Sequence, residues 1–220
     1  QPPKYDLHRF PGFSESIIYF NDIEKDPQYK EKLSTKLSSF FDKSDFGILP
    51  AFKENWNEVV FVIDFSDLYS KENLSALSGL SRALDIIKNG YPQRIGLLPL
   101  YHGEMPPVLR NIYELKTSKI EELKNFLEDL LTRKPQLKSS FDDLPPLKDV
   151  LQSLKITEPS IIINGEIYPF KANTWNYLIA KVLKKDVTHL KDELKKHDPN
   201  SELSVRGILH LKSQEVRNLK

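Results

Sequence analysis

Apolar residues fall along this chain in short continuous runs that alternate with stretches of helical spacing. The run from Val59 to Ile63 is apolar at every position, as expected of a strand covered on both faces. From about Glu72 to Lys88, leucine and isoleucine recur at helical spacing, and Asn89-Gly90 ends that helix because glycine readily takes the left-handed conformation. The run from Arg94 to Leu98 is the next buried strand. Strand, helix and strand at this spacing predict a right-handed parallel crossover.

A proline, a strand and a tight turn follow one another near residue 160. Glu158-Pro159 stands directly before the apolar run from Ser160 to Ile163, and Asn164-Gly165 separates this run from a second one that begins at Glu166. Proline has no amide hydrogen, so it belongs at the first position or the edge of a strand. Asn-Gly favours a two-residue hairpin, because both turn residues need positive φ. The segment therefore predicts a β-hairpin, and an amphipathic helix from Trp175 to Leu183 follows it.

The pattern predicts further elements at both ends of the chain. They are a strand at residues 16–20, a helix with Tyr29, Leu33, Leu37 and Phe40 on one face, a lysine-rich helix from about Val187 to His197, and a last strand, or the start of a next domain, at residues 203–211.

The segment from about 108 to 154 breaks the alternation of strands and helices. Ser118 and Glu121 form a capping box that opens a helix, Pro135 ends that helix, and Pro145-Pro146 starts another short one. We interpret this segment as a helical insertion between two strands of one sheet.

The order of the elements resembles that of a thioredoxin-like domain. We therefore expect an α/β thioredoxin-like fold over residues 1–211, with a helical insertion at about 108–154 and a tail or linker at 212–220. In that fold the X-Pro bond before the hairpin is cis and faces two redox cysteines, which implies a cis bond between Glu158 and Pro159; a trans proline at a strand edge is the alternative. Counting on from the strand that ends at Asp64, the two cysteine positions fall near Ser70 and Asn73.

The composition removes thiol chemistry. The chain of 220 residues has no cysteine, so it has no disulfide, no thiolate nucleophile and no cysteine metal site. Its 32 basic and 31 acidic residues are balanced, which disfavours nucleic acid as a partner, and no apolar stretch approaches the ~20 residues of a membrane span. The five histidines share no metal-like spacing. The chain starts at Gln1 without an initiator methionine, and we expect it to be part of a longer polypeptide.

Four segments carry a more specific resemblance. Residues 17–29, 53–64, 92–99 and 159–170 resemble the third thioredoxin-like domain of the UDP-glucose:glycoprotein glucosyltransferase family, the folding sensor of the endoplasmic reticulum. Lys30-Glu31 stands where that family has Trp-Pro, and Phe46-Gly47 where it has Pro-Gly. These departures are more similar to fungal members, including the paralogue required for cell-wall β-1,6-glucan.

The resemblance implies a role without bond chemistry in this domain. In the family these domains are redox-inactive, lie in the lumen of the endoplasmic reticulum and take part in recognising misfolded glycoproteins together with other domains of the same chain. UDP-glucose and a divalent metal are bound by an Asp-x-Asp in the catalytic domain, and no Asp-x-Asp occurs here. We therefore expect no cofactor and no enzyme activity in this domain. The rival interpretation is a redox-dead chaperone domain like those of protein disulfide isomerases.

Ser70 and Asn73 have two interpretations. They are a vestigial redox site, or Ser70 is simply the N-cap of the following helix. Asn73-Leu74-Ser75 is also the only N-glycosylation triplet of the chain, which makes Asn73 a candidate glycan acceptor.

Apolar side chains fall in the loops expected around Pro159. We predict that some of Leu68, Tyr69, Tyr101 and Met105 form an exposed patch that binds hydrophobic clients. The alternative is that the helical insertion covers them.

Overall fold

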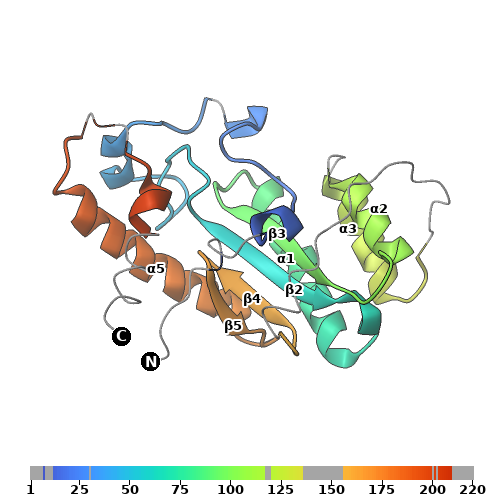
Figure 1. Cartoon of the computed structure of the whole chain (residues 1–220). Coiled ribbons are helices and arrows are strands. Elements are labelled where there is room, and N and C mark those ends of the chain that lie inside the picture. The colour runs from blue at the N-terminus through green and yellow to red at the C-terminus, as the bar shows by residue number, and fades with distance from the viewer. Residues whose placement is uncertain are drawn as a thin grey trace.

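The structure is a computed structural model that describes residues 7, 12–29, 31–116, 120–135, 156–199, 201 and 203–209. It contains a mixed α/β architecture in which a twisted sheet is covered by helices (Figure 1). Figure 1 shows α2 and α3 side by side at one end of the sheet and α5 at the other. The expected tail at 212–220, the Ser118 end of the capping box and the short helix after Pro145 lie outside the described residues.

The strands of the described residues form one sheet. They are Ile18–Tyr19 (β1), Glu58–Asp64 (β2), Arg94–Leu100 (β3), Ser160–Ile163 (β4) and Glu166–Pro169 (β5), in the spatial order β1-β3-β2-β4-β5. The labelled α-helices of the described residues are Lys71–Lys88 (α1), Pro107–Leu115 (α2), Ile120–Leu131 (α3) and Trp175–Leu194 (α5). None of the described helices combines the length and the apolarity that crossing a membrane requires.

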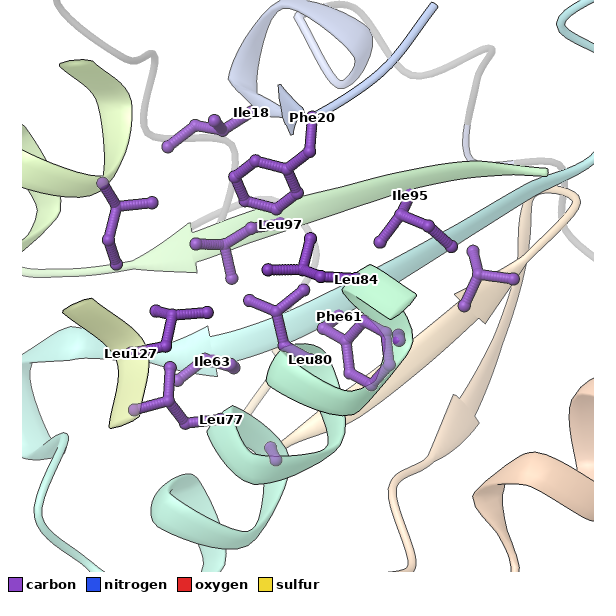
Figure 2. Packing of buried hydrophobic residues seen from close by; sticks show 14 of the residues in the cluster. Ile18, Phe20, Phe61, Ile63, Leu77, Leu80, Leu84, Ile95, Leu97 and Leu127 are labelled. Carbon is purple, nitrogen blue, oxygen red and sulfur yellow. The ribbon is translucent and has the colours of Figure 1, made fainter. Parts of the chain in front are cut away.

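Strand β2 forms the centre of the domain and confirms the prediction of a strand buried on both faces. Val59, Phe61 and Ile63 point into a core with α1 and α3, while Val60 and Val62 join a second cluster on the opposite face. Phe61 is fully buried, with ring centroids 5.7 Å from Trp175 and 6.1 Å from Phe170. Figure 2 shows Phe61 beside Leu80 and Leu84 of α1. A run without polar positions is needed because neither face of β2 reaches water.

The parallel crossover is also confirmed. Strand β2 pairs in parallel with β3 from Glu58–Arg94 to Asp64–Leu100, and α1 connects the two strands. Helix α1 begins after Ser70, and Gly90 follows its carboxyl end with a φ of +75°. Its apolar face packs on the sheet because leucine recurs every third or fourth position.

The hairpin forms at the predicted turn. Strands β4 and β5 pair antiparallel, and Asn164 and Gly165 connect them with φ of 50° and 83°. Both angles are positive, as the Asn-Gly pair predicts. The Asn164 side chain also accepts a hydrogen bond from the Glu58 amide at 2.9 Å and donates to Asp186 at 2.7 Å, so this turn is tied both to β2 and to α5.

The prediction of a helix with Tyr29, Leu33, Leu37 and Phe40 on one face is wrong. Among its described residues, this segment forms no α-helix, and its helical turns are the 3-10 turns Pro27–Tyr29 and Leu37–Phe41. Between them the Ser34 amide donates to Ala51 at 3.2 Å, and the Lys53 amide donates to Ser34 at 2.8 Å. A backbone that pairs with a distant segment cannot also make the hydrogen bonds of a helix.

The carboxyl-terminal elements differ from the prediction in two ways. The Trp175 helix and the lysine-rich helix are one continuous helix, α5, because no turn residue separates them. Residues 205–209 are helical instead of a strand, and residues 210 and 211 lie outside the described part. Val205 and Ile208 pack against α5 and Trp56, so this helix joins the domain.

The helical insertion is confirmed where the structure describes it. Helices α2 and α3 lie between β3 and β4 in the chain, and α3 packs against α1. Leu123, Leu127 and Leu130 of α3 are fully buried in the main core. Residues 136–154 of the expected insertion are outside the described residues.

Strand β1 approaches β3 closely, and Gly96 permits this approach. A Cβ at Gly96 would lie 2.8 Å from Ile17 Cγ2 and 3.3 Å from the Ile18 carbonyl oxygen. We expect Gly96→Ala to lower the free energy of unfolding by about 1–3 kcal/mol, as overpacking does in other cores. Urea denaturation measures this change. Gly207→Ala is the matched control, because a Cβ there meets nothing closer than 3.5 Å; equal stability of both variants would contradict the close approach.

Candidate functional site at the carboxyl ends of β2 and β3

The structure brings the candidate positions to one end of the sheet. Asp64 pairs with Leu100 at the ends of β2 and β3, and the loops that follow carry Leu68, Tyr69, Tyr101 and Met105. Strand β4 runs antiparallel to β2 with Ser160 opposite Val62, which places Pro159 at the same end. The amide of His102 donates to the Ser66 hydroxyl at 2.9 Å and links the two loops.

Ser70 and Asn73 hold the start of α1. The Ser70 hydroxyl accepts a hydrogen bond from the Asn73 amide at 3.2 Å, so Ser70 is the N-cap that its residue type predicts. The Asn73 side chain accepts from the Asp64 amide at 3.0 Å and donates to the Asp67 carbonyl and the Ser70 hydroxyl, both at 2.9 Å. The end of β2, the turn after it and the first turn of α1 are thus joined through one amide side chain.

The Asn73 amide is poorly placed for a glycan. Asn73 is 4% exposed, and its side-chain nitrogen donates two hydrogen bonds inside the turn. A glycan is attached to this nitrogen and needs solvent around it. In the folded domain its attachment would require Asn73 to leave this network.

The prediction of a cis Glu158–Pro159 bond is wrong. The described residues contain no cis peptide bond. Pro159 enters β4 from a trans bond, and its carbonyl accepts a hydrogen bond from the Phe170 amide at 3.1 Å, which extends the hairpin by one step. The trans form of an X-Pro bond is favoured by about 0.5–1 kcal/mol unless its surroundings select the cis form. At the start of α1, a serine and an asparagine hydrogen-bond to each other, and the chain has no cysteine pair that a cis proline could face.

This arrangement can order a helix, but it offers no reacting group. The Ser70 hydroxyl oxygen accepts hydrogen bonds from the amide and from the side-chain nitrogen of Asn73, and neither of these groups is a base. Within the described residues, no group of three or more His, Asp or Glu side chains is placed to hold a metal ion.

The predicted apolar patch is largely covered. Leu68 is 5% exposed and belongs to the main core, and Tyr101 and Met105 are half-buried against the same core. Only Tyr69, at 42%, is exposed. Leu68 therefore cannot belong to an exposed patch, and Tyr101 and Met105 could contribute only part of their surface to one.

Tyr69 contacts a residue just after the end of α3. The Arg133 guanidinium lies 5.6 Å from the centre of the Tyr69 ring and donates to the Tyr69 carbonyl at 3.5 Å. Arg133 takes a φ of 61°, at the point where α3 has ended. The alternative interpretation, in which the helical insertion covers this end of the sheet, is the one that the structure supports.

The half-buried residues carry a stability prediction. We expect the double substitution Tyr101→Ser with Met105→Ser to lower the free energy of unfolding by about 2 kcal/mol, because both side chains pack on the core. Tyr69→Ser is the control and should change it by less than ~0.5 kcal/mol. Thermal and urea unfolding measure both variants. A stable double variant would restore the exposed-patch hypothesis.

Sequence reasoning missed a polar cluster at the other end of β2. Glu58 has only 2% of its side chain exposed, and its carboxylate lies 3.5 Å from Arg94 and 3.6 Å from Arg206. The Tyr19 hydroxyl donates to the same carboxylate at 3.2 Å, while the Arg94 guanidinium lies 3.6 Å from the centre of the Tyr19 ring. A glutamate at the start of an apolar run gave no signal of burial, because strands often begin with a solvated charge.

The surroundings of this cluster keep the Tyr19 phenol protonated and the Asp22 carboxyl ionised. Burial and the nearby Glu58 carboxylate raise the pKa of Tyr19, so the phenol stays protonated and donates. Burial alone would raise the pKa of Asp22, but a hydrogen bond from Asn55, the charge of Arg94 and two backbone amides outweigh it and lower that pKa. Asp22 is therefore ionised beside Arg94, at 3.8 Å.

Glu54 fixes the carboxyl-terminal helix beside this cluster. Its carboxylate accepts hydrogen bonds from the Ser204 hydroxyl at 2.8 Å and from the amides of Val205 and Arg206 at 3.0 and 2.9 Å. A carboxylate at a helix N-terminus satisfies amides that have no partner within the helix. Glu54 and Glu58 together tie residues 204–206 to the sheet.

Comparison with known proteins agrees with the fold. The model of a family described as a thioredoxin-like domain matches residues 6–218. Killer toxin-resistance protein 5 of Saccharomyces cerevisiae is 51% identical over 227 residues, which cover 100% of this chain and 17% of the yeast protein. The chain therefore spans about a sixth of the length of this curated relative. The similarity agrees with the resemblance to the fungal paralogue of the glucosyltransferase family.

Proposed function

Because this chain belongs to the family of thioredoxin-like domains, we propose that it is a non-catalytic domain of a large glycosyltransferase-family protein. Its role is to bind or position the substrate for a catalytic domain elsewhere in the polypeptide. UDP-glucose and a divalent metal belong to that other domain. We place the protein in the lumen of the endoplasmic reticulum, with misfolded glycoproteins as substrates.

One observation carries the non-catalytic assignment. The side chains of Ser70 and Asn73, near which the sequence count puts the two cysteine positions of redox-active thioredoxins, complete a hydrogen-bonded cap. The chain has no cysteine elsewhere that could replace them. A site that has become structural in this way supports a scaffold or recognition role over redox chemistry.

The 51% identity to Killer toxin-resistance protein 5 favours a second candidate function. The resemblance to the fungal paralogue implies a part in the synthesis of cell-wall β-1,6-glucan. In that case the same domain positions a different substrate or a neighbouring domain, and folding sensing is not its role. A redox-dead chaperone domain of the disulfide-isomerase kind remains the third candidate, and its whole chain would end without a glycosyltransferase domain.

A replacement experiment in the parent polypeptide tests these candidates. The domain is exchanged for a redox-inactive thioredoxin-like domain of unrelated sequence, and a second parent carries the exposed control Asn125→Ala on α3. Glucose transfer from UDP-glucose to a denatured glycoprotein and the β-1,6-glucan content of the wall are measured in both. Loss of transfer in the exchanged protein alone supports substrate recognition, and loss of wall glucan alone supports the second candidate. If the exchanged protein retains both activities, the proposal is wrong.

A further inference from the structure

The short helix at residues 205–209 depends on contacts with a distant part of the chain. It has five residues, far fewer than the ~12–15 at which an isolated helix becomes marginally stable in water. Its first turn is held by the Glu54 carboxylate, which accepts three hydrogen bonds from residues 204–206. The Arg206 guanidinium adds an ion pair with Glu58 at 3.6 Å. Both carboxylates lie at or just before the start of β2.

The apolar side of this helix covers a surface that is separate from the main core. Val205 is fully buried and Ile208 is 9% exposed, and both belong to a cluster with Trp56 and with the second half of α5 (Val187, Leu190 and Leu194). The central residues of β2 and the apolar face of α1 belong to a different cluster. Departure of residues 204–209 would therefore uncover Trp56 and α5 and leave the core around β2 in place.

Two features lower the cost of such a departure. The buried Glu58 carboxylate would still have Arg94 at 3.5 Å and the Tyr19 hydroxyl at 3.2 Å, so the loss of Arg206 does not leave its charge without a partner. The Trp56 indole nitrogen is buried without a hydrogen-bond partner among the described residues. An unpaired buried donor costs free energy, and contact with water removes that cost.

We propose that residues 204–209 form a displaceable strap that opens as a unit while the sheet and α1 stay folded. Segments with few buried apolar side chains and few hydrogen bonds are the ones that open locally in folded proteins. Glu54 keeps the strap closed, because it accepts the hydrogen bonds of the first strap residues. The strap thereby controls access to the apolar surface of Trp56 and α5. This inference does not depend on the proposed function.

Thiol labelling of the native chain tests the proposal, because the chain has no cysteine of its own. Val205→Cys reports on the strap, and Val59→Cys, at a fully buried position of β2 in the main core, reports on unfolding of the whole chain. Each rate is divided by the rate of the same thiol in urea-unfolded chain. We expect position 205 to react about 100-fold faster than position 59, or more, because local opening is more frequent than global unfolding.

Two second substitutions separate local from global opening. Glu54→Ala removes hydrogen bonds that only the closed strap makes, and should speed labelling at position 205 about tenfold or more. Leu127→Ala weakens the main core, which is intact whether the strap is closed or open. It should speed labelling at position 59 about 30-fold or more and change the rate at position 205 by less than about twofold. Glu128→Ala, on the exposed face of α3, is the control and should change neither rate.

The opposite results overturn the strap. Equal rates at positions 205 and 59, or equal acceleration of both by Leu127→Ala, mean that residues 204–209 leave only when the whole chain unfolds. An unchanged rate at position 205 in Glu54→Ala means that Glu54 does not hold the segment closed. If Leu127→Ala fails to fold, Ile163→Val removes a single methyl group from the same core and takes its place, with the same pattern expected at a smaller size.

Discussion

Replacing Glu58 with alanine is expected to lower the free energy of unfolding by about 3 kcal/mol. The substitution leaves Arg94 and Arg206 without the buried carboxylate that lies 3.5 and 3.6 Å from them. Breaking a buried ion pair from one side is costly, because the remaining charge stays in a poorly solvated place. Such a loss costs about 3–5 kcal/mol. Arg94 keeps its hydrogen bond to the Asn21 carbonyl at 3.2 Å and its ion pair with Asp22 at 3.8 Å, so we expect a cost at the lower end of this range. Urea denaturation measures the change.

Two further variants separate charge from packing. Glu58→Gln keeps the volume of the side chain and removes its charge, so its loss of stability should lie between wild type and Glu58→Ala. Glu128→Ala on the exposed face of α3 is the surface control and should change stability by less than ~0.5 kcal/mol. If Glu58→Ala behaves like Glu128→Ala, the cluster around Glu58 does not stabilise the fold.

The centre of the fold could be predicted because its signals are local. Val59 to Ile63 have no polar position, and the leucines of α1 recur at helical spacing, so strand and helix are each specified within a few residues. Asn164-Gly165 specifies the hairpin in the same way, since both residues adopt positive φ. Residues 203–211 carry no such local signal, and the helix at residues 205–209 depends on Glu54, about 150 residues earlier in the chain.

The amino-terminal segment shows why apolar spacing can mislead. Tyr29, Leu33, Leu37 and Phe40 are all buried, as a helix face would be. However, Tyr29 and Leu33 pack with Ile23, while Leu37 and Phe40 pack in a separate cluster. One segment therefore supplies apolar residues to two separate clusters, and their spacing in the sequence resembles that of a helix although the segment is not an α-helix.

The candidate site was predicted in position but not in detail. The thioredoxin-like order places Ser70, Asn73 and Pro159 at one end of the sheet, and the pairing of β4 with β2 agrees with this. The capping role of Ser70 follows from its residue type. The role of Asn73 does not, because its partners at Asp64 and Asp67 belong to the end of β2 and to the turn after it. The covering of Tyr101 and Met105 likewise depends on where distant helices pack.

Placing cysteines at Ser70 and Asn73 is expected to destabilise the domain. In Ser70→Cys with Asn73→Cys, the thiols cannot replace the Ser70 cap or the three side-chain hydrogen bonds of Asn73. Loss of the cap costs about 1 kcal/mol, and the Asp64 amide and the Asp67 carbonyl lose partners at about 1 kcal/mol each. We therefore expect the reduced double variant to lose about 2–4 kcal/mol in urea denaturation under reducing conditions.

The matched control for this variant is Asn125→Cys, which replaces an exposed asparagine of α3 and should leave stability within ~0.5 kcal/mol of wild type. The single variants show how much of the lost stability comes from each position. Asn73→Cys should account for most of it, because the Asn73 side chain makes more hydrogen bonds than that of Ser70. A double variant as stable as wild type would show that these positions are free to carry thiols. A destabilised one would mean that the hydrogen bonds of Asn73 at the start of α1 stabilise the fold, and that a thiol pair cannot be placed there without rebuilding this end of the sheet.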